Sequence, residues 1–335
     1  TLFPYTTLFR SGDGLHIFGR GPQGLGESAG LLAALNGQRV AAGPAGSPHR
    51  GRSDVLPTGR NLYSVDPRAV PSRAAHAQGI KLAEELIRRH LQDKGDFPRG
   101  LVVDLWGSAT MRTAGEELAM AMHLAGLAPL WDADRVTGFE VIPLALLNRP
   151  RIDVTLRISG LFRDIFPALG QMFQAGVAAL AARDESPEDN PYLTDAARVY
   201  GPKPGLYGMG MDVHGYSDAG RDAAGEAWLT ASSYAITASG EIAHDRDGMV
   251  ARLRGADAFA HIQDLVETDI LMAADYAAHE GGFAAAQALV GAAPAALYHV
   301  DSANTPRARL VNEELGLVLR ARAANPDWAN GMMRH

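Results

Sequence analysis

Residues 101–107 read LVVDLWG, a short apolar run that holds one carboxylate and ends at a glycine. Its length and its Val and Leu content are typical of a buried strand. A helix is predicted before it, from Ser72 to Lys94, with Pro71 at its start and Gly95 just past its end. A second helix is predicted after it, over 114–126. This order of elements indicates an α/β fold.

The same alternation continues toward the C-terminus. Strands are predicted in RIDVTLRISG (151–160), ADAFAHIQD (256–264) and AALYHVD (295–301). Helices are predicted over 166–184, 218–231, 281–290 and 306–324, the last ended by Asn325-Pro326. Alternating strands and helices predict a parallel, doubly wound sheet with flanking helices. Residues 19–59 are rich in Gly, Pro, Ser and Arg and are predicted to form a linker or surface loop.

Composition excludes several classes of protein and of site. The 335-residue chain has 47% apolar residues, no cysteine and a formal net charge of −7 without a basic block. Disulfides and thiolate chemistry are therefore excluded, and nucleic acid is not an expected partner. No apolar run is long enough to span a membrane. The absence of cysteine fits a cytoplasmic protein.

Polar residues follow each predicted strand. The four segments are GSATMRT, SGLFRD, DLVETD and DSANTPR. Ligands of open α/β sheets bind beyond the carboxyl ends of the strands, so these segments predict a polar cleft shared by several loops. Arg112, Arg157 and Arg163 lie near strand ends, where three roles stay open. They either cap helices, pair with Asp104, Asp153 and Asp164, or bind a carboxylate ligand.

Short catalytic motifs are incomplete. The pattern G-x-G-x-x-G at Gly19, Gly21 and Gly24 is followed by no suitable helix and contains Pro22. GESAG, with Ser28 at its centre, matches a nucleophile elbow but lacks the strand that should precede it. No Gly-Lys dipeptide occurs, so a P-loop is excluded from this chain.

His299 and Asp301 are spaced two residues apart in a predicted strand, so both point to one face at its end. By itself His299 is equally compatible with a hydrogen-bonded structural histidine. Asp269, Asp275 and Glu280 are equally compatible with solvated helix charges.

Four longer stretches resemble a known family. They are VLPTGRNLYSVDPRAVPSRAA, WGSATMRTAGEELAMAMHLAGLAPLWD, GFEVIPLALLNRPRIDVTLRISGLFRDIFP and NPDWANGMMRH. They closely resemble the large subunit of aerobic cobaltochelatase, and their landmarks recur in the magnesium chelatase H subunit. The resemblance runs from about Leu15 to His335. YGPKPGLYGMG, DLVETDILMAADYAAHEGG and LYHVDSANTPR favour the cobalt branch.

The resemblance implies one α/β part of a larger multidomain subunit that binds a tetrapyrrole. The implied reaction inserts Co²⁺, as substrate, into a corrin precursor such as hydrogenobyrinic acid a,c-diamide. An AAA+ ATPase subunit, which uses the ATP, and a second companion subunit are the implied partners. Two alternatives remain open: a magnesium chelatase H subunit acting on protoporphyrin IX, and a tetrapyrrole-binding or partner-docking module without catalytic groups.

Metal insertion requires groups that take up the ion and accept the pyrrole protons. Under the resemblance we expect catalytic roles for His299, Glu280 and Asp269, and transient metal contacts from His299, Glu280 and Asp301. The expected substrate-binding residues are Arg112, Arg157, Arg163, Arg60 and Tyr63.

Four segments are expected along the chain. Residues 1–11 match an in-frame translation of a sequencing adapter and are expected to be an artefact, with family sequence missing at both ends. A partial N-terminal segment with a Gly/Pro-rich loop is expected over 12–59. Parts of the α/β chelatase domain are expected over 60–185 and 186–335.

Overall fold

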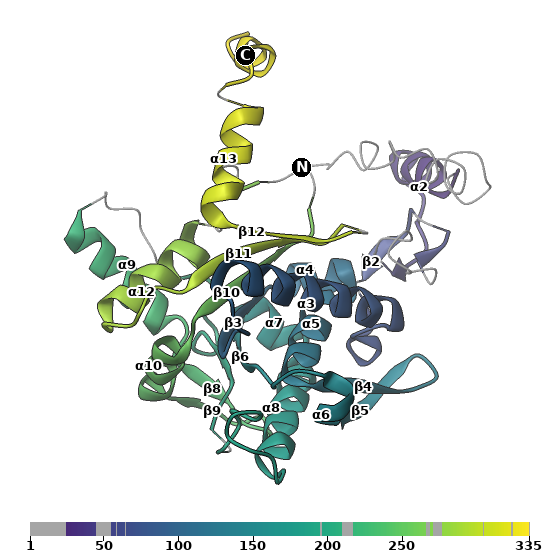
Figure 1. Ribbon diagram of the computed structural model, residues 1–335. Helices are drawn as coiled ribbons and strands as arrows, with labels where there is room; N and C mark the ends of the chain where they lie inside the picture. The colour runs from purple at the N-terminus through teal and green to yellow at the C-terminus, as the bar shows by residue number, and fades with distance from the viewer. Residues whose placement is uncertain are drawn as a thin grey trace.

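The computed structural model describes residues 25–44, 55–57, 59–63, 65–194, 196–209, 217–265, 269–270, 277–303, 305–322 and 324–334. Its centre is an eight-stranded sheet with the order β12-β11-β10-β3-β6-β7-β8-β9 (Figure 1). Five neighbouring strands are parallel: β11 (Ala296–Asp301), β10 (Ala258–Gln263), β3 (Gly100–Leu105), β6 (Asp153–Ile158) and β7 (Val199–Gly201). The antiparallel strands are β12 (Arg307–Leu310), β8 (Tyr234–Ile236) and β9 (Ile242–His244). The predicted mostly parallel α/β sheet is thus confirmed, with antiparallel strands at both edges.

Helices cover both faces of this sheet. One face packs the larger hydrophobic core, to which α3 (Arg73–Lys94), α5 (Glu116–Ala125), α7 (Gly160–Ile165) and α8 (Pro167–Ala181) contribute. The other face packs a smaller core with α9 (Asp218–Thr230), α10 (Arg246–Gly255) and α12 (Gly282–Leu289). Val102 and Phe259 on the sheet belong to this second core, whereas Val103 and Ala260 belong to the first, as strand alternation requires.

The termini of α3 follow the predicted capping pattern. The hydroxyl of Ser72 accepts a hydrogen bond from the backbone N–H of Ala75, and Gly95 adopts a left-handed conformation with φ of 81°. A serine N-cap and a glycine at the C-terminus satisfy backbone groups that the helix itself leaves unpaired. The predicted bounds of this helix are confirmed.

Two segments differ from the sequence-based expectation. Arg307–Leu310 form strand β12 instead of the first turn of a helix, because they pair with β11; helix α13 (Val311–Ala321) begins only afterwards. Leu25–Leu35, expected in a linker or loop, form helix α2, whose Leu and Ala content favours a helix. Ser28 lies inside α2 and not at a strand-to-helix turn, so the interpretation of GESAG as a nucleophile elbow is excluded. Gly19, Gly21 and Gly24 lie outside the described residues.

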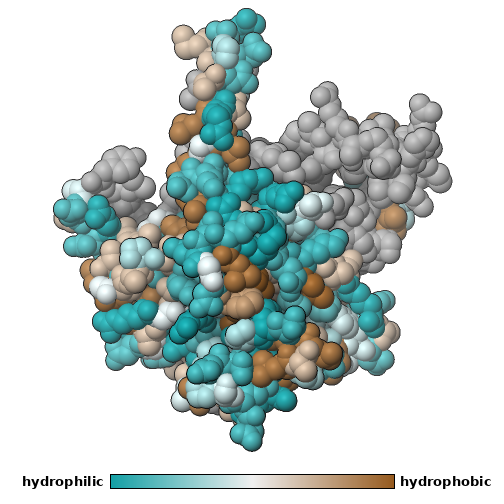
Figure 2. Space-filling view, in the orientation of Figure 1, coloured by the Kyte–Doolittle hydropathy of each residue, from teal (hydrophilic) through white to brown (hydrophobic). Residues whose placement is uncertain are grey.

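The remaining elements surround this body. A hairpin is formed by β4 (Leu127–Asp132) and β5 (Arg135–Val141), and β1 (Gly43–Pro44) pairs with β2 (Asn61–Tyr63). Helix α13 and, beyond it, α14 (Pro326–Met332) extend away from the sheet, and the face seen in Figure 2 is largely hydrophilic with small hydrophobic groups. Within the described ranges no helix is both long and apolar enough to cross a bilayer. The sheet takes strands from both 60–185 and 186–335.

Candidate functional site

A row of polar side chains crosses the middle of the sheet. His299 on β11 is in register with His261 on β10, His261 with Asp104 on β3, and Asp104 with Arg157 on β6. Residues in register on parallel strands point to the same face, here the face of the smaller core. His299 is 4% exposed and the other three are still more buried. Such groups are stable in the interior only when they compensate one another.

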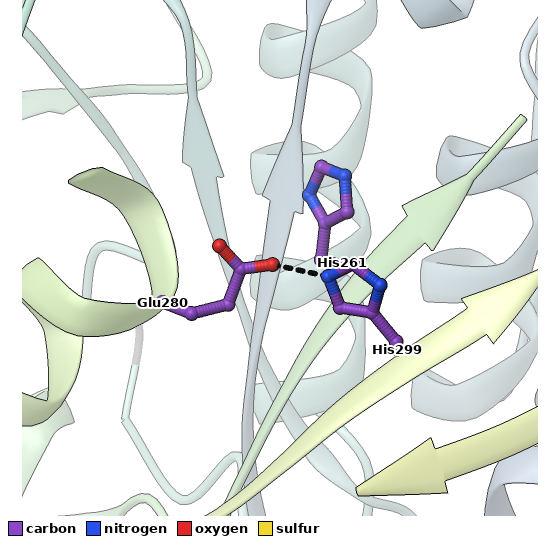
Figure 3. Close-up of side chains that lie close together, drawn as sticks. All are labelled: His261, Glu280 and His299. Atoms are coloured by element: carbon purple, nitrogen blue, oxygen red, sulfur yellow. Dashed lines mark hydrogen bonds and ion pairs between the residues drawn. The ribbon is translucent and has the colours of Figure 1, made fainter. Parts of the chain in front are cut away.

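Glu280 completes a cluster with the two histidines of this row (Figure 3). It comes from a π-helical turn, η5 (Ala277–Gly281), that directly precedes α12. One ligand atom from each of His261, Glu280 and His299 lies within 4.8 Å of the other two. Nε2 of His299 lies 2.5 Å from Oε1 of Glu280. Two imidazoles and a carboxylate form a donor set that suits a divalent transition-metal ion.

The second oxygen of Glu280 lacks a hydrogen-bond donor within the described residues. Oε2 is buried, and no residue of those ranges donates to it. A buried carboxylate oxygen without a donor is unfavourable. A cation that entered the cluster would compensate it, so this oxygen supports the interpretation of the cluster as a metal site.

Asp104 connects this cluster with its neighbours. Its Oδ2 accepts a hydrogen bond from Nε1 of Trp106 at 2.5 Å and lies 2.6 Å from Nδ1 of His279. Its Oδ1 lies 3.4 Å from Nη1 of Arg157, and Oδ2 lies 3.6 Å from Nδ1 of His261. Burial acts to raise the pKa of Asp104, but His279, His261 and Arg157 together hold this pKa well below its ordinary value. The carboxylate therefore favours its ionised form.

The two acidic groups beside His261 also affect its protonation. Burial acts to lower the pKa of His261, but Glu280 and Asp104 outweigh burial, so that this pKa lies above its ordinary value. The indole of Trp106 contacts two imidazoles, since its ring centroid lies 4.7 Å from that of His261 and 4.7 Å from that of His279.

The three predicted arginine clamps have different environments. Arg112 donates from Nε and Nη2 to the carboxylate of Asp264 at 2.6 and 2.8 Å, and its side chain is 36% exposed. Arg157 is buried in the polar row, where it also donates to Oγ of Ser232 at 3.2 Å. Arg163 is buried and binds Asp164 and three backbone carbonyls. Among these three, only Arg112 has a partly exposed side chain.

The remaining predicted site residues lie outside the cluster. Asp301 shares a face of β11 with His299 but lies 3.2 Å from Nη1 of Arg309. Asp269 forms an ion pair with Arg322 at the C-cap of α13. Arg60 donates to the carbonyls of Pro57 and Leu56 next to β2. Tyr63 is a residue of β2, and its side chain lies outside the described part of the structure. The structure thus brings together His299 and Glu280 from the predicted catalytic set.

Two histidines of the site were missed by the sequence analysis. His261 lies within a predicted strand without having been considered as a ligand. His279 was assigned no role, because its segment AAHEGGF lacks the second histidine of an H-E-x-x-H zinc motif. One pattern could have found His261. Strands β10 and β11 read AFAHIQ and ALYHVD, and each has histidine as its fourth residue. Parallel pairing from their first residues places these histidines side by side.

The sequence matches the model of one known protein family. Residues 20–335 match the family model described as CobN/Magnesium Chelatase. The chain belongs to this family. It is 43% identical over 341 residues to the aerobic cobaltochelatase subunit CobN of a Sinorhizobium species. The match covers 93% of this chain and 27% of that relative, so the chain spans about a quarter of its length.

A solved structure shows the same fold for this part of the CobN/magnesium chelatase family. The catalytic subunit of cobaltochelatase from Mycobacterium tuberculosis superposes with a TM-score of 0.82 at 37% identity, over 92% of this chain and 28% of that one. The magnesium-chelatase H protein of Cereibacter sphaeroides is 29% identical over 92% of this chain and 27% of its own length. Identity is thus lower to this magnesium relative than to the cobalt one.

A further buried acid lies close to the site of this CobN-family chain. Glu117 is 1% exposed in the first turn of α5, where its Oε2 accepts a hydrogen bond from Oγ1 of Thr110 at 3.2 Å. Burial and the nearby carboxylate of Asp264 raise the pKa of Glu117 well above its ordinary value, although Arg112 opposes them. Glu117 therefore favours its protonated form.

Proposed function

We propose that the chain is part of the tetrapyrrole-binding large subunit of an ATP-dependent cobaltochelatase. The subunit inserts Co²⁺ into a corrin precursor, hydrogenobyrinic acid a,c-diamide, in aerobic cobalamin synthesis. The main support is the cluster of His261, Glu280 and His299 in a chain that is 43% identical to a cobaltochelatase subunit. Two nitrogen donors and one oxygen donor suit Co²⁺, whereas Mg²⁺ prefers oxygen donors.

Insertion of the ion requires loss of its water, loss of two pyrrole protons and entry into the ring. We assign uptake of the ion to His261, Glu280 and His299. Metal binding to Nε2 of His299 would displace the proton that this nitrogen shares with Oε1 of Glu280. Glu280 is then placed to accept a proton as the ion moves to the ring. Asp104 and Arg157 hold the surrounding charges in fixed positions.

We assign binding of the tetrapyrrole ring to residues at the rim of the site. Arg112 is oriented by Asp264 and partly exposed, so it is the predicted arginine best placed to bind a peripheral carboxylate. Asp301 and Asp269 are engaged by Arg309 and Arg322, and we assign them to positioning these arginines.

The energy for insertion is assigned to partner subunits. The sequence contains no Gly-Lys dipeptide and hence no P-loop. We therefore place ATP hydrolysis on an AAA+ partner, with a second companion subunit, and place the assembly in the cytoplasm. Relatives named as chelatase subunits support an assembly of several chains.

Metal binding by the whole 335-residue chain tests this function. Co²⁺ titration followed by visible absorption is expected to show a site in the wild-type chain that His299→Ala and Glu280→Gln each weaken more than about tenfold. His244→Ala on β9 is the control, because His244 is exposed and lies on the far edge strand of the sheet. Equal Co²⁺ affinity in all four chains would refute the assignment.

Two further readouts separate the alternatives. Titration of the chain with the corrin precursor and with protoporphyrin IX distinguishes cobalt from magnesium chelation by the ring that binds more tightly. A docking module without catalytic groups predicts that His299→Ala and Glu280→Ala, made in the complete subunit, leave chelation unchanged.

A further inference from the structure

We infer that Leu161, Leu206 and Tyr207 form an apolar platform for one face of the tetrapyrrole, next to the buried polar row. This inference rests on the proposed function and names the surface that holds its substrate. Leu161 is in α7, which begins after β6, and the other two residues are in the loop that follows β7. Both segments therefore leave the carboxyl edge of the sheet, where open α/β sheets bind ligands.

All three side chains are apolar and exposed. Leu206 is 55% and Tyr207 58% exposed, and Leu161 is 36% exposed. The two segments that carry them approach each other closely, because a Cβ atom placed on Gly160 would meet the carbonyl oxygen of Leu206 at 2.5 Å and Cδ1 of Tyr207 at 2.9 Å. Gly160 is the residue before Leu161. Grouped apolar side chains on a protein surface are typical of a binding site.

The loop is held in place by Arg163. Nη1 of Arg163 donates to the carbonyls of Pro202, Lys203 and Leu206 at 2.9, 2.8 and 3.3 Å. Its guanidinium carbon lies 5.6 Å from the centroid of the Tyr207 ring. Oη of Tyr207 donates to Oδ2 of Asp164 at 2.5 Å. The tyrosine is therefore fixed in orientation while its ring stays exposed, which reduces the entropy lost when a ligand binds.

Contacts lead directly from this loop to the polar row. Met209, at the end of the described part of the loop, accepts a hydrogen bond at Sδ from Nη2 of Arg157. Arg157 in turn contacts Asp104 and His279. A chain of contacts through Met209 and Arg157 thus connects the loop that carries the platform with the buried polar row.

The occupant follows from the chemistry of this surface. A corrin precursor is a large macrocycle with apolar faces and anionic carboxylates at its rim. Tyr207 and the two leucines match the apolar face, and Lys203, exposed in the same loop, matches a carboxylate. The nearby His and Glu donors match the metal-accepting centre of the ring.

Ring binding by the whole chain tests the inference. Hydrogenobyrinic acid a,c-diamide and, separately, protoporphyrin IX are titrated into wild type, Tyr207→Ala and Leu206→Asp, with ring absorption and tryptophan fluorescence as readouts. Each variant is expected to bind the preferred ring about tenfold more weakly. Tyr207→Phe is expected to lose less affinity than Tyr207→Ala, because it keeps the ring and loses only the bond to Asp164. Leu146→Ala, an exposed leucine on α6 (Leu144–Leu147), is the surface control.

The outcomes separate this inference from the proposed function. If wild type binds a ring and Tyr207→Ala and Leu206→Asp bind it equally well, the platform is refuted while ring binding stands. If wild type binds neither ring, the platform and the proposed function are both refuted. Circular dichroism and thermal melting verify that each variant is folded.

Discussion

Nδ1 of His279 lies 2.6 Å from Oδ2 of Asp104, which joins the π-helical turn after β10 to the end of β3. The next residue on that turn, Glu280, forms a hydrogen bond with His299 on β11, which lies on the other side of β10 from β3. Consecutive side chains therefore bind two different strands of the sheet. The turn is tied to the polar row at both positions, and this arrangement places the carboxylate of Glu280 beside His261 and His299.

Asp104→Asn should destabilise the protein strongly. Asp104 is fully buried, and its loss leaves the buried guanidinium of Arg157 without its compensating charge. Removal of one partner of a buried ion pair costs about 3–5 kcal/mol. Urea unfolding measures this loss. The double variant Asp104→Asn/Arg157→Met is expected to be more stable than Asp104→Asn alone. If the loss of unfolding free energy in the double variant equals the sum of the losses in the two single variants, the two residues do not interact energetically.

Glu117→Gln should make the protein more stable at neutral pH. The pKa of Glu117 is raised in the folded state, so the unfolded chain releases this proton at lower pH than the folded chain does. The stability of wild type therefore falls as pH rises above the ordinary glutamate value. Glutamine resembles the protonated acid and has no such dependence. Thermal melts from pH 5 to pH 8 should show a variant advantage of a few degrees that grows with pH. An advantage that is constant with pH would contradict this account.

Arg163→Ala should release the loop over 201–209 rather than remove a ligand contact. The guanidinium is buried, and its donors serve three backbone carbonyls of this loop. Loss of charge-assisted bonds to buried acceptors costs about 2–3 kcal/mol. Faster amide hydrogen exchange confined to this loop and to α7 would verify the role. Unchanged exchange together with weaker ring binding would instead indicate a direct clamp.

Gly160→Ala should displace the same loop by a different route. A Cβ atom there would lie 2.5 Å from the carbonyl oxygen of Leu206, which is too close. Overpacking of this kind costs about 1–3 kcal/mol. Gly331→Ala is the matched control, since nothing lies within 4 Å of a Cβ at that position. If both variants melt at the temperature of wild type, the close approach of the loop to α7 is not present in solution.

Much of the fold followed from local sequence. Ser72 and Gly95 gave the bounds of α3 because capping depends on residues at fixed offsets. Four parallel strands, β3, β6, β10 and β11, were predicted from apolar runs. The antiparallel strands β8, β9 and β12 are only three or four residues long, and long-range pairing alone defines them.

The candidate site was predictable only in part. His299 was found because it ends a predicted strand, and Glu280 because the family resemblance drew attention to its segment. His261, His279 and Asp104 converge through strand order and register, which depend on contacts distant in sequence. The same limit applies to Asp301, whose partner Arg309 lies on a strand that was predicted as a helix.

The row from His299 to Arg157 ties the site to the pairing of the strands. Successive residues of a strand point to opposite sides, so one residue inserted within β3, β6, β10 or β11 would turn a charged group into the core beneath α3 and α5. Insertions after those strands leave the row intact. The register of four strands therefore fixes where these charges lie, whereas the loops beyond the strands can change in length without moving them.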